Sequence, residues 1–121
     1  MADRIRFVTY RDKQILLIDL SQCTLDEMRM LLAEIQDTIT SQPLDSVLVM
    51  TDFTGVDYFG RDLGEDIKKT LVFDRPYVKR AAWVGADVVP HAHYESFKSF
   101  SRRELPMFAT REEAMEWLVG E

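Results

Sequence analysis

The segment QILLIDLSQCTLDEMRMLLAEIQDTITSQPLDSVLVMT, residues 14–51, decides the fold expected for this chain. It begins with an apolar run at residues 14–20 and ends with another at residues 46–51, as expected for strands covered on both faces of a sheet. Between them, Thr24 and Glu27 form a capping box, in which each side chain satisfies a free backbone amide of the other at a helix start. Two strands joined through a helix run parallel, with a right-handed crossover.

The rest of the chain extends this unit into an open α/β sheet. Residues 4–10 alternate between polar and apolar side chains and predict a half-buried strand, which forms an antiparallel hairpin with residues 14–20 at one edge. The further predicted elements are a helix over residues 61–71, a strand over 79–85, a helix that begins at Pro90, a strand over 105–108 and a helix capped by Thr110 and Glu113, with Trp117 on its inner face. The predicted fold class is α/β: an open, mostly parallel sheet of four to five strands with helices packed on it, in the order β-β-α-β-α-β-α-β-α.

Composition indicates one domain over residues 1–121, with 46% hydrophobic and 30% charged residues. The net charge of −6 argues against a nucleic-acid partner, which needs clustered lysine and arginine. The one cysteine, Cys23, excludes an internal disulfide and fits a reducing compartment. The N-terminus shows neither a signal peptide nor a membrane span, so we expect a cytoplasmic protein.

Two carboxylates end the central apolar runs, where open α/β sheets usually bind ligands. Asp19 and Asp52 there could hold Mg²⁺, but the favoured interpretation is that they cap the loops at the sheet edge. His91 and His93 point to opposite sides of a helix and cannot share a metal there. Cys23 has no nucleophile signature around it, and we expect it to be a small buried hydrophobe. We therefore predict no catalytic residues, no metal and no cofactor.

The chain resembles the STAS domain superfamily, in particular the SpoIIAA-like group of small single-domain bacterial proteins. The resemblance covers residues 6–118, and the most specific piece is the ending MFATREEAMEWL. The other pieces are QILLIDLSQCT, SVLVMTDFTGV and KRAAWVGA. This resemblance implies a regulatory module that binds a protein partner and has no catalysis of its own. The better-known members are anti-sigma factor antagonists, switched by phosphorylation of a serine at the start of the helix after the central strand.

The acceptor serine of that switch is absent here. The family turn falls at positions 60–63, which are Gly60, Arg61, Asp62 and Leu63. Asp62 is either a permanent negative charge that replaces the phosphate at a helix N-terminus or, as we favour, an ordinary acidic residue of the first turn. Thr54 is an alternative acceptor, although a loop residue bonded to local backbone is the favoured role.

Two hypotheses about function follow, and an enzyme is a weak third. The first is a protein-interaction surface over the loop and helix that follow residues 46–51. Its residues are Thr54, Asp57, Tyr58, Phe59, Arg61, Asp62, Glu65 and Lys69. The second is a carrier or sensor of an apolar small molecule or lipid, gated by the helix 61–71, with a membrane surface as another contact. Its residues are Leu63, Ile67, Leu71, Phe73 and Tyr77. A homodimer through the edge strand or the aromatic helix stays open.

Overall fold

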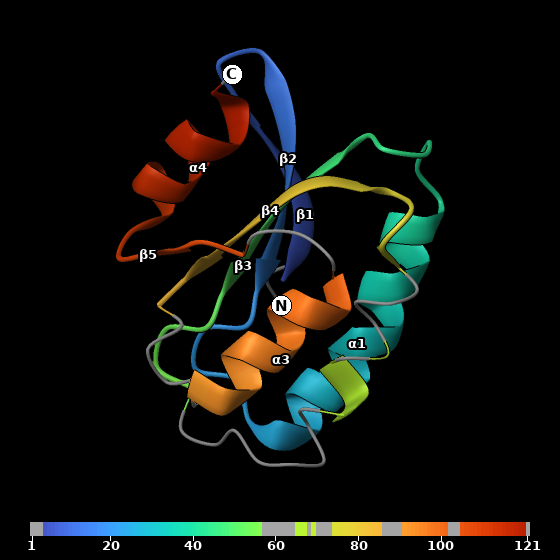
Figure 1. Cartoon of the computed structure of the whole chain (residues 1–121), viewed down its shortest axis with the longest axis vertical. Coiled ribbons are helices and arrows are strands. Elements are labelled where there is room, and N and C mark those ends of the chain that lie inside the picture. The colour runs from blue at the N-terminus through green and yellow to red at the C-terminus, as the bar shows by residue number, and fades with distance from the viewer. Residues whose placement is uncertain are drawn as a thin grey trace.

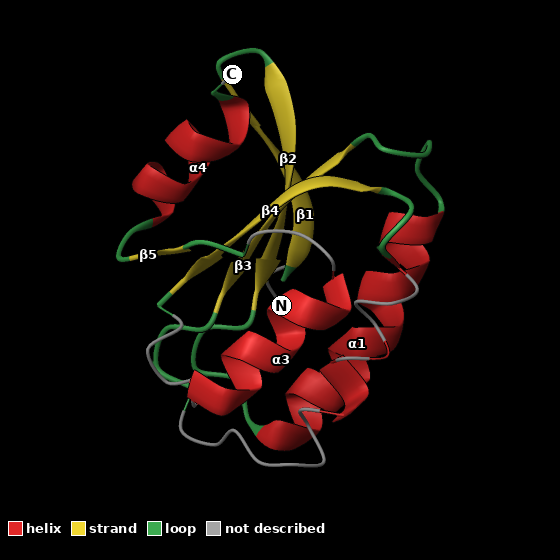
Figure 2. Ribbon diagram, viewed as in Figure 1, coloured by secondary structure: helices red, strands yellow, loops and turns green. Residues whose placement is uncertain are grey.

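The computed structural model describes residues 4–56, 65–67, 69, 74–85, 91–101 and 105–120. The chain forms a sheet flanked by helices (Figures 1 and 2). The elements are β1 (Ile5–Tyr10), β2 (Lys13–Asp19), α1 (Leu25–Thr40), β3 (Val47–Asp52), β4 (Val78–Val84), α3 (His91–Ser101), β5 (Met107–Phe108) and α4 (Arg111–Val119). Residues 65–67 and 69 are also helical.

The strands lie in the order β1-β2-β3-β4-β5 in one sheet. β1 pairs with β2 in antiparallel fashion, and every other pair is parallel. This confirms the predicted open, mostly parallel α/β sheet with its one antiparallel strand at an edge. The register places Asp19, at the end of β2, directly opposite Asp52, at the end of β3.

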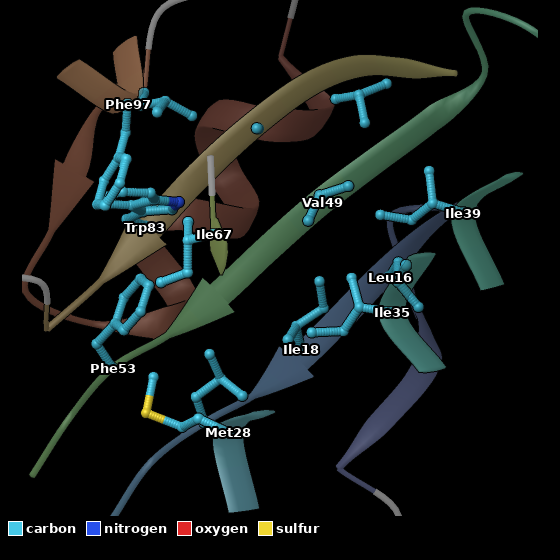
Figure 3. Close-up of a cluster of buried hydrophobic side chains, with 14 of the residues drawn as sticks. Leu16, Ile18, Met28, Ile35, Ile39, Val49, Phe53, Ile67, Trp83 and Phe97 are labelled. Carbon is cyan, nitrogen blue, oxygen red and sulfur yellow. The ribbon is translucent and has the colours of Figure 1, made fainter. Parts of the chain in front are cut away.

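The helix α1 follows from local sequence. Thr24 accepts a hydrogen bond from the backbone amide of Glu27, and the Glu27 side chain accepts one from the amide of Thr24, so the predicted capping box is present. Met28, Ile35 and Ile39 recur at helical spacing and are buried against the sheet (Figure 3). Leu31 and Leu32 are partly buried against the same core, and the side chain of Leu25 lies outside the described part.

Each inner strand supplies alternate side chains to two cores. Leu16 and Ile18 of β2 face the layer that contains α1, α3 and Ile67. Ile15 and Leu17 face the opposite layer, which α4 covers with the two residues Ala114 and Leu118. These four β2 residues are at most 3% exposed, as predicted for a strand covered on both faces. The first layer also holds an aromatic group in which the Trp83 ring lies 5.0 Å from that of Phe53 and 5.6 Å from that of Phe97 (Figure 3).

One predicted element is shorter in the structure, another is only partly described, and one predicted core residue is only partly buried. The last strand is shorter than the predicted span 105–108 and begins at Met107, because the preceding Pro106 has no amide for the sheet. Of the predicted helix 61–71, residues 65–67 and 69 are helical and the others lie outside the described residues, as does Pro90. Trp117, predicted to point inward, is partly buried and packs against the core that α4 covers, with the Arg80 guanidinium 3.9 Å from the centre of its ring.

Candidate functional site

The carboxyl ends of β2 and β3 form the edge at which ligands of such sheets usually bind. There, Asp52 Oδ1 accepts hydrogen bonds from the backbone amide of Thr54 at 2.9 Å and from its hydroxyl at 2.6 Å. Asp19 Oδ1 accepts in the same way from the amide of Ser21 at 3.1 Å and from its hydroxyl. Each aspartate therefore caps the loop that follows its own strand, which confirms the favoured interpretation of the sequence.

A guanidinium bridges the two carboxylates. Arg111 Nε lies 2.7 Å from Asp52 Oδ2, and Arg111 Nη2 lies 3.2 Å from Asp19 Oδ1. Burial disfavours the charged form of Asp19, but hydrogen bonds from Ser21 and the nearby charge of Arg111 outweigh it and lower the pKa of this carboxyl. Burial similarly opposes the charge of Arg111, but its contacts with Asp52 and Asp19 raise the pKa of the guanidinium. An arginine thus supplies the positive charge for which the sequence suggested Mg²⁺.

The sequence analysis did not assign a role to Arg111. Its position is set by the second capping box, in which Thr110 accepts from the amide of Glu113 and α4 begins at the residue after Thr110. The bridge to Asp52 spans 59 residues of sequence. The only local signal was a basic residue in the first turn of a helix, where acidic residues are favoured. Such a residue points to a negatively charged neighbour elsewhere in the fold.

Thr54 lies in a tight crossing of three loops. Gly85, just after β4, has φ +63°, and a β-carbon there would come within 2.4 Å of Thr54 Oγ1. The carbonyl oxygen of Thr54 accepts from the amide of Gln22 at 2.8 Å, so three loops meet at this residue. Its hydroxyl already donates to Asp52, and a phosphoryl group on it would set a dianion beside that carboxylate. The geometry therefore favours a loop role for Thr54 over a phosphoryl acceptor.

The predicted partner-binding residues are only partly within the described structure. Thr54, Glu65 and Lys69 are exposed. Glu65 and Lys69 belong to the helical residues 65–67 and 69, and an ion pair of 3.5 Å between Arg29 Nε and Asp66 Oδ2 joins these residues to α1. The predicted residues Asp57, Tyr58, Phe59, Arg61 and Asp62 lie outside the described residues.

An apolar pocket lies between α1 and the sheet, with a volume of about 80 Å³. Ile67, predicted for an apolar-ligand site, lines this pocket and is 7% exposed. Tyr77, predicted with it, is partly buried and packs against the same core without appearing among the lining residues. The other predicted residues, Leu63, Leu71 and Phe73, lie outside the described part of the chain. The structure therefore brings one predicted residue of this set to a pocket.

The sequence analysis missed Asp74, which also lines the pocket. Asp74 is 4% exposed, and this burial raises the pKa of its carboxyl group from 3.8 to about 7. Its Oδ1 has no hydrogen-bond partner among the described residues. A single aspartate before a proline-containing turn is ordinarily a surface residue, so nothing local in the sequence marked it.

The remaining candidates give no reactive centre. Cys23 is a free, buried thiol of the core, and burial raises its pKa, as expected for a small hydrophobe. In the part of the chain that the structure describes, no three histidine, cysteine, aspartate or glutamate side chains gather in a way that could hold a metal ion. No helix within the described ranges is long and apolar enough to cross a bilayer.

Comparison with known proteins supports one family. The SpoIIAA-like family profile matches residues 18–119. A solved structure of an uncharacterised DUF3478-family protein with a SpoIIAA-like fold, from Shewanella loihica PV-4, superposes with a TM-score of 0.72 at 16% identity, covering 94% of this chain and 91% of that one. An anti-sigma-factor antagonist (STAS) domain protein from Planctomyces limnophilus gives a TM-score of 0.60 at 15% identity, covering 96% and 98%. No curated protein matches the chain. With the fold and most of its length matched, this chain belongs to the SpoIIAA-like family.

Proposed function

We propose that this protein is a non-catalytic regulatory module that works by binding another protein. Membership of the SpoIIAA-like family supports this function, as does the shared fold with a protein described as an anti-sigma-factor antagonist. The edge of the sheet also supports it. Asp19, Asp52 and Arg111 are engaged with one another and with their own loops, so they hold a rigid frame.

The observation that carries the proposal is a set of exposed side chains on α1 and on the helical residues 65–67 and 69. Met30 on α1 is 78% exposed, although a methionine at this degree of exposure gains nothing within the fold. The ion pair between Arg29 and Asp66 joins these helical residues to α1, and Glu65 and Lys69 are exposed near Asp66 in sequence. An exposed, adaptable apolar side chain on α1 and exposed charges of both signs on the residues joined to it suit a protein partner, with charge pairing setting the register.

A pair of charge reversals tests this surface. Glu65→Lys changes the proposed surface, whereas Glu112→Lys makes the same change at an exposed position of α4, on the opposite layer of the sheet. Each tagged variant is compared with the wild-type protein by quantitative mass spectrometry of co-purified proteins and by thermal unfolding. We expect at least one protein that the wild type and Glu112→Lys retain equally, and that Glu65→Lys loses more than tenfold with unchanged unfolding temperature. Equal recovery by all three chains would contradict the proposal.

A second function, carriage or sensing of an apolar small molecule, is favoured by the pocket under α1. Its lining is aliphatic and aromatic apart from three residues, and Ile67, one of the described residues of the predicted helix 61–71, forms part of it, as a site gated by that helix requires. Binding of 1-propanol tests this function. Trp83 lines the pocket and Trp117 lies in the opposite layer, so a Trp117→Phe variant reports through Trp83 fluorescence. Saturable one-to-one binding is expected, and a linear, unsaturated response would exclude the function.

A further inference from the structure

The pocket under α1 combines an apolar wall with one buried acidic group. α1, β2, β3 and β4 contribute side chains that do not ionise, and Thr51 is the one polar residue among them. The charged residues of the described lining are Asp74 and Arg75, at the turn before β4. Figure 3 shows Ile67, Phe53 and Trp83 gathered on the same layer as Ile35 of α1. The volume of about 80 Å³ is smaller than the roughly 150 Å³ cavity that accepts benzene, and it suits a short alkyl chain.

Asp74 is held in this pocket by the backbone rather than by its side chain. The amide of Tyr77 donates to the carbonyl oxygen of Asp74 at 2.9 Å, which closes the turn that leads into β4. The carboxyl group itself is buried, and its Oδ1 has no hydrogen-bond partner within the described residues. A buried polar atom without a partner is costly, so few are retained in native proteins without a reason.

The chemistry of this atom selects the ligand. An ionised carboxylate only accepts hydrogen bonds, so its complement is a donor, and a cationic donor also offsets the burial of the negative charge. Arg75 would favour an anion instead, but this residue is only partly buried and is not without a partner. The group in need of a partner is therefore the acid and not the base.

We propose that this pocket binds a small primary amine, with the alkyl chain among the apolar side chains and the ammonium group donating a hydrogen bond to Asp74 Oδ1. The proposal rests on the second proposed function, that the pocket holds an apolar small molecule. It adds the polar end of that molecule and the residue that recognises it.

The amine is distinguished from other ligands by its pH dependence. With a pKa of about 7, Asp74 is about one-tenth ionised at pH 6 and about nine-tenths ionised at pH 8. A primary alkylamine stays protonated over this range, as lysine does. The association constant of propylamine should therefore rise about tenfold from pH 6 to pH 8. That of 1-propanol should change less than twofold, and propanoate should bind more weakly than either at pH 8.

The experiment titrates propylamine, 1-propanol and propanoate into the Trp117→Phe chain at pH 6 and pH 8, with Trp83 fluorescence and calorimetry as readouts. The same titrations are made with Asp74→Asn, which keeps the shape of the side chain and removes its charge. We expect this variant to bind 1-propanol as before and to lose both the preference for propylamine and its pH dependence. The pH series on the chain that keeps Asp74 is an independent measurement should the variant fold poorly.

The outcomes separate the proposal from the function on which it rests. If 1-propanol binds but propylamine gains nothing from Asp74 or from higher pH, the amine assignment is overturned and the pocket function stands. Tighter binding of propanoate would likewise overturn it in favour of Arg75. If neither 1-propanol nor propylamine binds, both the second function and the amine assignment are wrong.

Discussion

Replacement of Asp74 by asparagine should change how the free energy of unfolding depends on pH, whatever the pocket binds. The carboxyl has a pKa of about 7 in the folded protein, against 3.8 for an exposed aspartate. Between these values the folded state binds more protons than the unfolded state, so the wild-type chain loses stability as the pH rises from about 4 to 7. The asparagine side chain does not titrate, so the variant lacks this loss.

The size of the effect follows from the two pKa values. Each pH unit of displacement is worth about 1.4 kcal/mol, so the whole rise from 3.8 to about 7 corresponds to about 4 kcal/mol. About 3 kcal/mol of this loss falls between pH 5 and pH 8. At pH 5 the carboxyl of Asp74 is already ionised in the unfolded chain but not in the folded chain. The asparagine variant should therefore gain about 3 kcal/mol relative to the wild type over this interval.

Urea unfolding of both chains at pH 5 and pH 8, followed by tryptophan fluorescence, measures this difference. Groups such as Asp19 and Glu27, whose pKa values are lowered in the fold, stabilise the protein as the pH rises and act in both chains alike. The comparison between chains removes their contribution. A difference that stays within about 0.5 kcal/mol across the interval would show that Asp74 is solvated or paired, and the argument for its role would fail.

Two further substitutions test the edge of the sheet, each with a matched control and with urea unfolding as the assay. Arg111→Met removes the arginine that bridges two facing aspartates and leaves Asp19 only the longer contact, 3.9 Å, with Arg4 Nη1. We expect a loss of about 2 kcal/mol, less than for a fully buried pair because the Arg111 side chain is 35% exposed. Arg11→Met removes an ion pair whose arginine is 64% exposed and should cost less than about 1 kcal/mol, so equal losses would refute the bridge as a stabilising feature. Gly85→Ala places a β-carbon at φ +63° and 2.4 Å from Thr54 Oγ1, and we expect a loss of about 2 kcal/mol. Gly120→Ala, with φ −69°, should cost under about 1 kcal/mol, and a similar loss at both glycines would contradict the strain argument.

The order and direction of the elements could be predicted from the sequence. Both capping boxes, at Thr24 and at Thr110, are present where their spacing placed them. The apolar runs at residues 14–20 and 46–51 became β2 and β3, buried on both faces and paired in parallel. These signals are local, because capping and side-chain periodicity act between residues a few positions apart. The connection through a helix then fixed the parallel direction of the strands.

The candidate site could be predicted only in part from the sequence. That Asp19 and Asp52 lie together followed from the parallel strands, but their counter-ion, Arg111, is 59 residues beyond Asp52. Ile67 was predicted for an apolar site from its spacing, and it does line a pocket. Whether a face of helical spacing lines a cavity or a filled core depends on the shapes of several elements packed together.

The sequence by itself determined the sheet, its helices and the edge at which two carboxylates meet, because each is encoded by short-range pattern. Only the tertiary structure decided which charge neutralises that edge and that Asp74 is buried. Both depend on contacts between distant segments. The sequence gives the type of side chain at each position. Its desolvation depends on the elements that surround it in the fold, and desolvation sets both its pKa and its need for a partner.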